Sequence, residues 1–194
     1  MYTVGILEIL KPIILATTAS TYAGFSPAFR REAGSYGKDT RGILRVHQFE
    51  KVEMVSYAKE EDEIAELNFL TEIAEKFVSD LGLSYRLIKL ASRDISFPAS
   101  ETRDIEIWMP AQNKYRETHS VSTTGTFQAR RLNIKYQEGS DKKFAVILNG
   151  TAFAIGRTLI AILENYQQPD GSVLIPEVLQ KYTGFEMISP KQSK

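Results

Sequence analysis

The sequence contains no cysteine and only two histidines, His47 and His119, among its 194 residues. The absence of cysteine excludes disulfides and thiolate metal sites. With only two histidines, a histidine-based zinc site or a serine–histidine–aspartate triad is also disfavoured. The absence of cysteine gives no signal of redox compartment, though it fits a reducing cytosol or an engineered cysteine-free chain. We expect the protein to be cytoplasmic.

The sequence also lacks an excess of charge of one sign. Lys plus Arg and Asp plus Glu each number 24, so the formal net charge is zero. Free-standing nucleic-acid binders usually carry a basic excess, because phosphate contacts dominate their affinity. Any RNA contact must therefore be local.

The longest apolar stretch, from Val4 to Ala16, is broken by charged residues and Pro12 and is too short to cross a bilayer.

What is present predicts one folded α+β domain spanning residues 1–194. Hydrophobic residues make up 43% and charged residues 25%, which is typical of a globular core. Apolar residues spaced three and four apart from Ile64 to Leu81, followed by Gly82, predict a helix whose acidic residues face solvent. Alternating or β-branched runs predict strands at 24–32, 42–57, 85–90, 104–109, 115–119 and 143–148. Few crossover helices separate them, so we expect a mostly antiparallel sheet flanked by helices.

One segment combines arginine, aromatic and acidic residues on two predicted strands. Phe29-Arg30-Arg31-Glu32 ends the first strand, and Arg45 to Glu53 lies in the second. Since side chains alternate between the faces of a strand, Arg30 and Glu32 share one face. In the second strand the same alternation groups Arg45, His47, Phe49, Lys51 and Glu53. Such a face suits a nucleotide and an amine-bearing substrate. A structural ladder of ion pairs is the alternative, and spacing alone leaves it open.

A second segment, Asn149-Gly150-Thr151, stands where a predicted strand meets an apolar helix over 152–166, with Arg157 soon after. A Gly-rich helix start offers backbone N–H groups to an anion, and an arginine within an apolar helix needs an anionic partner. The alternative is an ordinary helix cap followed by an arginine that reaches water.

Together these segments resemble the seryl-tRNA synthetases. FRREAGSYGKDTRGILRVHQFEKVE (29–53) resembles motif 2 of that family, and LNGTAFAIGRTLIAILENYQQPDGSVLIPEVLQKYTGF (148–185) resembles motif 3 and the C-terminal end. WMPAQNKYRE and FQARRLNIKY resemble the strands that link them, and the likeness runs collinearly from about Tyr22 onward. The resemblance implies a class II synthetase-like catalytic core that uses ATP to convert serine to seryl-adenylate.

The resemblance also implies roles at the ATP site. Arg30 would contact the α-phosphate, Phe49 would stack on adenine, and Glu32 would accept from its amino group. Arg157 would bind the γ-phosphate, and Arg45 is also assigned to the ATP site. Arg30 and Arg157 are then the catalytic residues, because positioning, metal ions and two arginines suffice without a protein nucleophile.

Metal and serine sites follow from the same resemblance. Glu117 and Ser120 would hold Mg²⁺ with the phosphates. The residues assigned to serine binding are Glu8, Glu53, Asn149 and Thr151. His47 is expected to support the site from its strand, His119 to be incidental, and Phe127 to lie in the core or the pocket wall.

The sequence departs from the family in ways that narrow these expectations. The tRNA-binding coiled coil and motif 1 have no counterpart, so we expect weak or no tRNA binding and a monomer or a non-native dimer. Ile6 replaces a pocket threonine, and Ala28 stands where a cysteine is common. These departures favour an engineered, reduced core, with a natural divergent paralogue as the alternative. A core that binds ATP with little or no catalysis is the alternative function.

Overall fold

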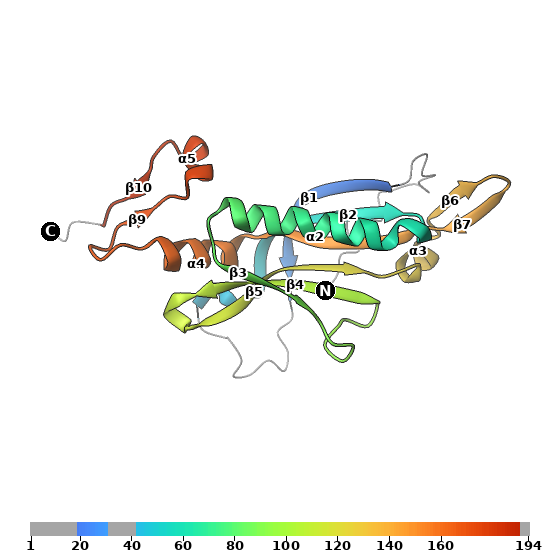
Figure 1. Ribbon diagram of the computed structural model, residues 1–194, viewed down its shortest axis with the longest axis horizontal. Helices are drawn as coiled ribbons and strands as arrows, with labels where there is room; N and C mark the ends of the chain where they lie inside the picture. Colours follow the sequence, from blue (N-terminus) through green and yellow to red (C-terminus); the bar gives the residue numbers. More distant parts are fainter. Residues whose placement is uncertain (1–18, 31–41, 191–194) are drawn as a thin grey trace.

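The computed structural model describes residues 19–30 and 42–190 (Figure 1). Within these residues the main sheet has six strands in the order β1-β2-β8-β5-β4-β3, and each neighbouring pair is antiparallel. The strands are β1 (Ala19–Phe29), β2 (Gln48–Ala58), β8 (Val146–Ala154), β5 (Lys114–Thr123), β4 (Glu101–Met109) and β3 (Tyr85–Lys89). The predicted α+β fold with a mostly antiparallel sheet is confirmed.

Helix α2 (Glu63–Asp80) lies along one face of this sheet and supplies much of the core (Figure 1). Leu67, Leu70, Ala74 and Val78 are fully buried in one cluster with residues from β2, β4, β5 and β8. The helix ends at Asp80, and Gly82 follows with a φ of +68°, in the left-handed region that glycine adopts without strain. The helix predicted from apolar spacing is therefore confirmed.

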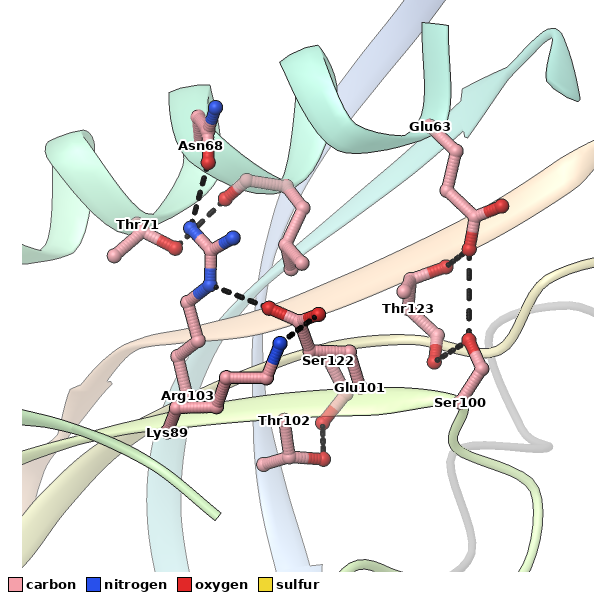
Figure 2. Close-up of polar contacts among 11 residues, drawn as sticks. Glu63, Asn68, Thr71, Lys89, Ser100, Glu101, Thr102, Arg103, Ser122 and Thr123 are labelled. Atoms are coloured by element: carbon pink, nitrogen blue, oxygen red, sulfur yellow. Dashed lines mark hydrogen bonds and ion pairs between the residues drawn. The ribbon is translucent and has the colours of Figure 1, made fainter. Parts of the chain in front are cut away.

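The acidic residues of α2 do not all face solvent, and that prediction is wrong for Glu66 and Glu63. Glu66 is buried, and its Oε1 accepts hydrogen bonds from the hydroxyls of Ser56 (2.5 Å) and Thr21 (2.9 Å). Glu63 accepts from the Thr123 hydroxyl at 2.6 Å (Figure 2). The reason is that the sheet presents hydroxyl donors beneath the first half of α2, so the carboxylates turn inward and bind the helix to the strands.

Further polar contacts fix the sheet edge near α2 (Figure 2). Arg103 of β4 donates to Asn68 of α2 at 2.7 Å and to Glu101 at 2.9 Å. At the start of β4, the Ser100 amide donates to the Thr123 carbonyl at 2.8 Å. These contacts hold the end of the β3–β4 loop against both the sheet and the helix.

The remaining elements lie around the ends of the sheet. Helix α4 (Ile155–Tyr166) follows β8 directly. Helix α3 (Phe127–Leu132) and the hairpin of β6 (Lys135–Glu138) and β7 (Asp141–Phe144) lie at one end, and β9 (Val173–Leu174), α5 (Glu177–Thr183) and β10 (Met187–Ile188) at the other (Figure 1). Short 3₁₀ turns are η1 (Gly42–Leu44), η2 (Glu60–Asp62) and η3 (Pro110–Gln112). Across the described ranges, every helix is too short or too polar to cross a bilayer.

Candidate functional site

A pocket of about 550 Å³ opens on the sheet face that α2 leaves uncovered. Side chains from β2, β5 and β8 form its floor, and the start of α4 closes one side. The alternation of β2 explains the division: Met54 packs in the core under α2, whereas Lys51 and Glu53 line the pocket. The volume falls in the range typical of small-molecule sites.

Two β-bulges determine which side chains reach the pocket. In β5, Ile105 pairs with His119 and Glu106 with Glu117, so Thr118 is an extra residue. In a regular strand Glu117 and Ser120 would face opposite sides, yet both line the pocket. A second bulge lies in β8, where the pairing with β2 skips Ala152. Bulges commonly re-aim side chains beside functional sites, and these two do so here.

Arg30 and Phe49 lie together at one side of the pocket. The Arg30 amide donates to the His47 carbonyl at 2.8 Å, which extends the β1–β2 ladder beyond Phe29. His47 Nδ1 lies 3.2 Å from the Arg30 carbonyl oxygen. The Arg30 guanidinium is 4.8 Å from the centre of the Phe49 ring, within the range of a cation–π contact. A cation and an aromatic plane are therefore adjacent, as the sequence predicted.

The prediction that Arg45 and His47 belong to the same strand as Phe49 is wrong. Residues 42–44 form η1, and β2 begins only at Gln48. The Leu44 carbonyl accepts a hydrogen bond from Arg157 Nε at 3.2 Å, so this segment folds against α4 instead of extending along the sheet. Arg45 does not line the pocket that the described residues form, whereas His47 supports the Arg30 backbone from just before β2.

Glu53 lies at the pocket floor in an ion pair with Lys51. Glu53 Oε2 is 2.6 Å from Lys51 Nζ, and both residues are 8% exposed. Burial raises the pKa of Glu53, while Lys51 and the Thr151 hydroxyl oppose that rise. Thr151 lies opposite Glu53 in the ladder, with its hydroxyl 3.5 Å from the carboxylate, and Asn149 also lines the pocket.

The structure thus brings together most of the residues assigned to ATP, metal and serine, and two lie outside its description. Those in the pocket lining are Arg30, Phe49, Glu53, Glu117, Ser120, Asn149, Thr151 and Arg157. Glu8 and Glu32 lie outside the described residues. Spacing alone had left a surface ladder of ion pairs as an alternative for the first segment. Lys51 and Glu53 do form an ion pair, but at 8% exposure it is buried in the pocket floor and is not part of a surface ladder.

The prediction that Asn149-Gly150-Thr151 opens a helix is wrong. All three residues lie within β8, and α4 begins only at Ile155. A Cβ on Gly150 would lie 3.2 Å from Val121 and 3.3 Å from Met54. Glycine therefore makes room for the side chains of two neighbouring strands and does not present backbone N–H groups to an anion. The Asn-Gly pair is typical of turns, which explains the error.

Arg157 lies in the first turn of α4 and points to the Glu117 end of the pocket. Its Nη1 donates to the Glu117 carbonyl at 2.7 Å and is 3.4 Å from the Glu117 carboxylate. The Arg157 side chain is 20% exposed, so it does not simply reach out to water. The guanidinium is thereby fixed between β5 and η1 with its fork beside the pocket.

Asp104 lies next to the pocket lining, beside Ser120, and the sequence pattern did not reveal it. It lies opposite Ser120 in the β4–β5 ladder and is 8% exposed. Its Oδ1 has no hydrogen-bond partner among the described residues. Burial raises the pKa of Asp104 to about 6, with Ser120 opposing and Glu117 adding to the shift. The only sequence signal was an acidic residue in a half-apolar strand, which is common on surfaces.

His119 is fully buried in β5 behind the pocket floor. Its ring lies edge-on to Phe153 with centres 6.0 Å apart, and its Nδ1 is 2.8 Å from the Thr118 hydroxyl. Burial lowers the pKa of His119 to about 4, although the Ala152 backbone opposes the shift. The unfolded chain protonates this histidine near 6.5. Between these values the unfolded state binds more protons, so stability rises with pH.

We expect His119 to make the free energy of unfolding fall by about 2–3 kcal/mol between pH 7 and pH 4.5. The loss occurs because the folded state keeps the imidazole neutral while the unfolded state gains a proton. His119→Gln should remove this part of the pH dependence, whatever its effect on stability at pH 7. Urea unfolding of both proteins across the pH range measures the two slopes. Equal slopes would contradict the assignment.

Comparisons with known proteins identify similar chains. The family model of the tRNA synthetase class II core domain (G, H, P, S and T) matches residues 20–166. The seryl-tRNA synthetase from Pyrococcus horikoshii complexed with ATP is 44% identical with a TM-score of 0.86, over 90% of this chain and 39% of that chain. The cytoplasmic serine-tRNA ligase from Naegleria fowleri in complex with AMP is 40% identical with a TM-score of 0.84, over 90% and 42%. The chain thus spans about two fifths of these proteins.

Proposed function

The chain belongs to the class II tRNA synthetase core family, and we propose that it uses ATP to convert serine to seryl-adenylate and pyrophosphate. The observation that carries the proposal is one pocket that combines the Arg30–Phe49 pair, the fixed Arg157 and the buried Glu53. In this proposal residues 1–194 act as a single adenylation domain, in the cytoplasm.

The ATP part of the proposal uses the two arginines and the aromatic ring. Adenine stacks on Phe49, which brings the nucleotide beside Arg30 because their side chains are in contact. Arg30 then binds the α-phosphate, and Arg157 binds the γ-phosphate from the Glu117 end of the pocket. Planar guanidinium groups match phosphate oxygens in pairs, so both sites favour arginine over lysine.

The serine part depends on a carboxylate that stays charged although it is buried. Glu53 receives the substrate ammonium, and Thr151 and Asn149 offer a hydroxyl and an amide to the serine hydroxyl. Burial alone would favour a protonated, neutral Glu53. The Lys51 ammonium at 2.6 Å opposes this and keeps negative charge available for the substrate.

Mg²⁺ fits the site only together with the nucleotide. In the described parts of the chain, no group of three or more His, Asp or Glu could hold a metal by itself. Glu117 and Ser120 offer hard oxygen ligands, and the unpartnered Asp104 Oδ1 places negative charge beside them. Phosphate oxygens would complete the shell that Mg²⁺ prefers. A bound Mg²⁺ ion would neutralise part of the negative charge on the phosphates.

The chemistry requires no protein nucleophile. A serine carboxylate oxygen attacks the α-phosphorus, the bond to the β-phosphate oxygen breaks, and pyrophosphate leaves with the electron pair. Arg30 and Arg157 stabilise the charge that builds on the phosphates, while Glu53 holds the serine ammonium so that its carboxylate faces the phosphorus.

The purified protein is expected to catalyse serine-dependent exchange between ATP and pyrophosphate. Serine, threonine, alanine and glycine should be compared in the same assay. We expect weak discrimination, because Ile6 lacks the hydroxyl of the family's pocket threonine and selectivity for serine depends on hydrogen bonds. Exchange no higher than that of the Arg30→Ala and Arg157→Ala variants would contradict the proposal.

A further inference from the structure

Three polar side chains meet behind the pocket, on the face of the sheet that α2 covers (Figure 2). The Thr123 hydroxyl donates to Glu63 Oε1 at 2.6 Å, and the Ser100 hydroxyl lies 3.5 Å from the same oxygen. Thr123 is 1% exposed, so its hydroxyl has little access to water. We call Glu63, Ser100 and Thr123 the Thr123 cluster. None of the three lines the pocket, and the proposed adenylation chemistry uses none of them.

The Thr123 hydroxyl has two partners at once. It donates to Glu63 and accepts a hydrogen bond from the Gly125 amide at 3.1 Å. The Gly125 carbonyl in turn accepts from the Ile147 amide at 3.0 Å. A continuous chain of hydrogen bonds therefore runs from α2 through the end of β5 into β8.

This chain of bonds lies where β5 pairs with β8, beside the part of the pocket proposed for serine. The pairs are Val121–Gly150, Ser122–Asn149 and Thr123–Leu148. Because side chains alternate along a strand, Ser122 faces away from α2, and it lines the pocket opposite Asn149. Directly opposite side chains on one face lie about 4.5–5.5 Å apart at Cβ, so Ser122 bounds the space open to the Asn149 side chain. In the proposed function, the Asn149 amide binds the serine hydroxyl.

Backbone pairing fixes β5 to β4 more firmly than to β8. β4 and β5 pair from Glu101 to Met109, and the Ser122 hydroxyl lies 2.8 Å from that of Thr102 (Figure 2). β2 likewise pairs with β8 from Lys51 to Ala58, whereas β5 and β8 share three pairs. The hydrogen bonds at the end of β5 therefore decide how Ser122 lies against Asn149.

We infer that Glu63, acting through Thr123, positions the end of β5 so that Ser122 keeps the Asn149 amide directed at the hydroxyl of bound serine. Glu63 is a positioning residue and touches no substrate. The inference rests on the proposed function, because the serine hydroxyl is the group whose contact the Thr123 cluster controls.

The test compares Thr123→Val with Thr71→Val in serine-dependent exchange between ATP and pyrophosphate. Valine has the shape of threonine without its hydroxyl, so Thr123→Val should raise the KM for serine about three- to tenfold, the range for weakening one neutral hydrogen bond. The KM for ATP should change little, because Phe49 and Arg157 belong to β2 and α4. Alanine has no hydroxyl, so its kcat/KM should fall less than that of serine. Thr123→Ser keeps the hydroxyl and should restore the wild-type KM for serine.

Thr71→Val is the matched control on α2 itself. Thr71 is 2% exposed, and its hydroxyl donates to the Leu67 carbonyl at 2.7 Å within the helix. The control therefore loses a buried threonine hydroxyl without changing β5, and it should keep the wild-type KM for serine. Glu63→Ala should match Thr123→Val. The double variant should be no worse than either single variant, because both changes break the same contact.

A serine KM of Thr123→Val equal to that of Thr71→Val, or additive effects of Glu63→Ala and Thr123→Val, overturns the positioning role and leaves the proposed function intact. No exchange by the wild-type protein contradicts the proposed function itself. Amide hydrogen exchange then decides the inference, because the Gly125 and Ile147 amides belong to the chain of bonds through Thr123. Faster hydrogen exchange at these amides in Thr123→Val than in Thr71→Val supports the positioning of β5, and equal rates overturn it.

Discussion

Replacing Arg157 by alanine is expected to lower kcat/KM for serine-dependent exchange by about 10²- to 10³-fold, the usual effect of removing one preorganised donor to developing charge. The side chain is held by the Leu44 and Glu117 carbonyls, so in the proposed function it would bind the phosphates without reorganising. Arg157→Lys should recover only part of the rate, because an ammonium cannot reproduce the two-pronged contact. Initial rates of exchange at several ATP concentrations measure the effect.

Arg86→Ala provides a control for the loss of an arginine as such. Arg86 forms an ion pair with Glu106 at 2.6 Å and lies over the Tyr115 ring, but it does not line the pocket. This variant should keep exchange near the wild-type rate. Exchange by Arg157→Ala within about threefold of the Arg86→Ala rate, well under one kcal/mol of transition-state stabilisation, would contradict the role of Arg157.

Replacing Glu53 by glutamine is expected to affect both serine use and stability. Loss of the carboxylate should lower kcat/KM for serine about 10²-fold or more while the KM for ATP changes little, because only the ammonium loses its partner. The same change leaves the Lys51 charge buried and unpaired. Breaking a buried pair in this way typically costs about 3 kcal/mol or more of unfolding free energy.

A double variant separates these two effects. In Lys51→Met/Glu53→Gln neither charge of this pair remains, so most of the stability should return, while serine-dependent exchange should stay low. Chemical unfolding and exchange assays on the single and double variants measure both quantities. Recovery of exchange together with stability would mean that Glu53 acts through folding alone.

The elements that follow from local periodicity could be predicted from the sequence. Helix α2 is one, because Leu67, Leu70, Ala74 and Val78 repeat at the spacing of a buried helix face. The contact between Arg30 and Phe49 did not follow from local periodicity, because the predicted second strand began at residue 42 whereas β2 begins only at Gln48.

Features that depend on pairing between distant strands could not be predicted. No local pattern marks Thr118 or Ala152 as bulged, because a bulge is defined by the partner strand. Glu117 and Ser120 therefore line the same pocket, although strand alternation alone would place them on opposite faces of the sheet. The inward turn of Glu66 has the same origin, since its hydroxyl donors come from β1 and β2.

The Glu66 contact has a consequence for how the site can open. Strand β1 lies at one edge of the sheet and pairs with β2 alone in the described sheet, so its ladder can fray. Arg30 follows the end of this strand, and the Thr21–Glu66 hydrogen bond ties the other end to α2. Peeling of β1 would carry Arg30 away while the core under α2 stays folded. Mild denaturant should therefore inactivate the proposed nucleotide site through local unfolding before the domain unfolds.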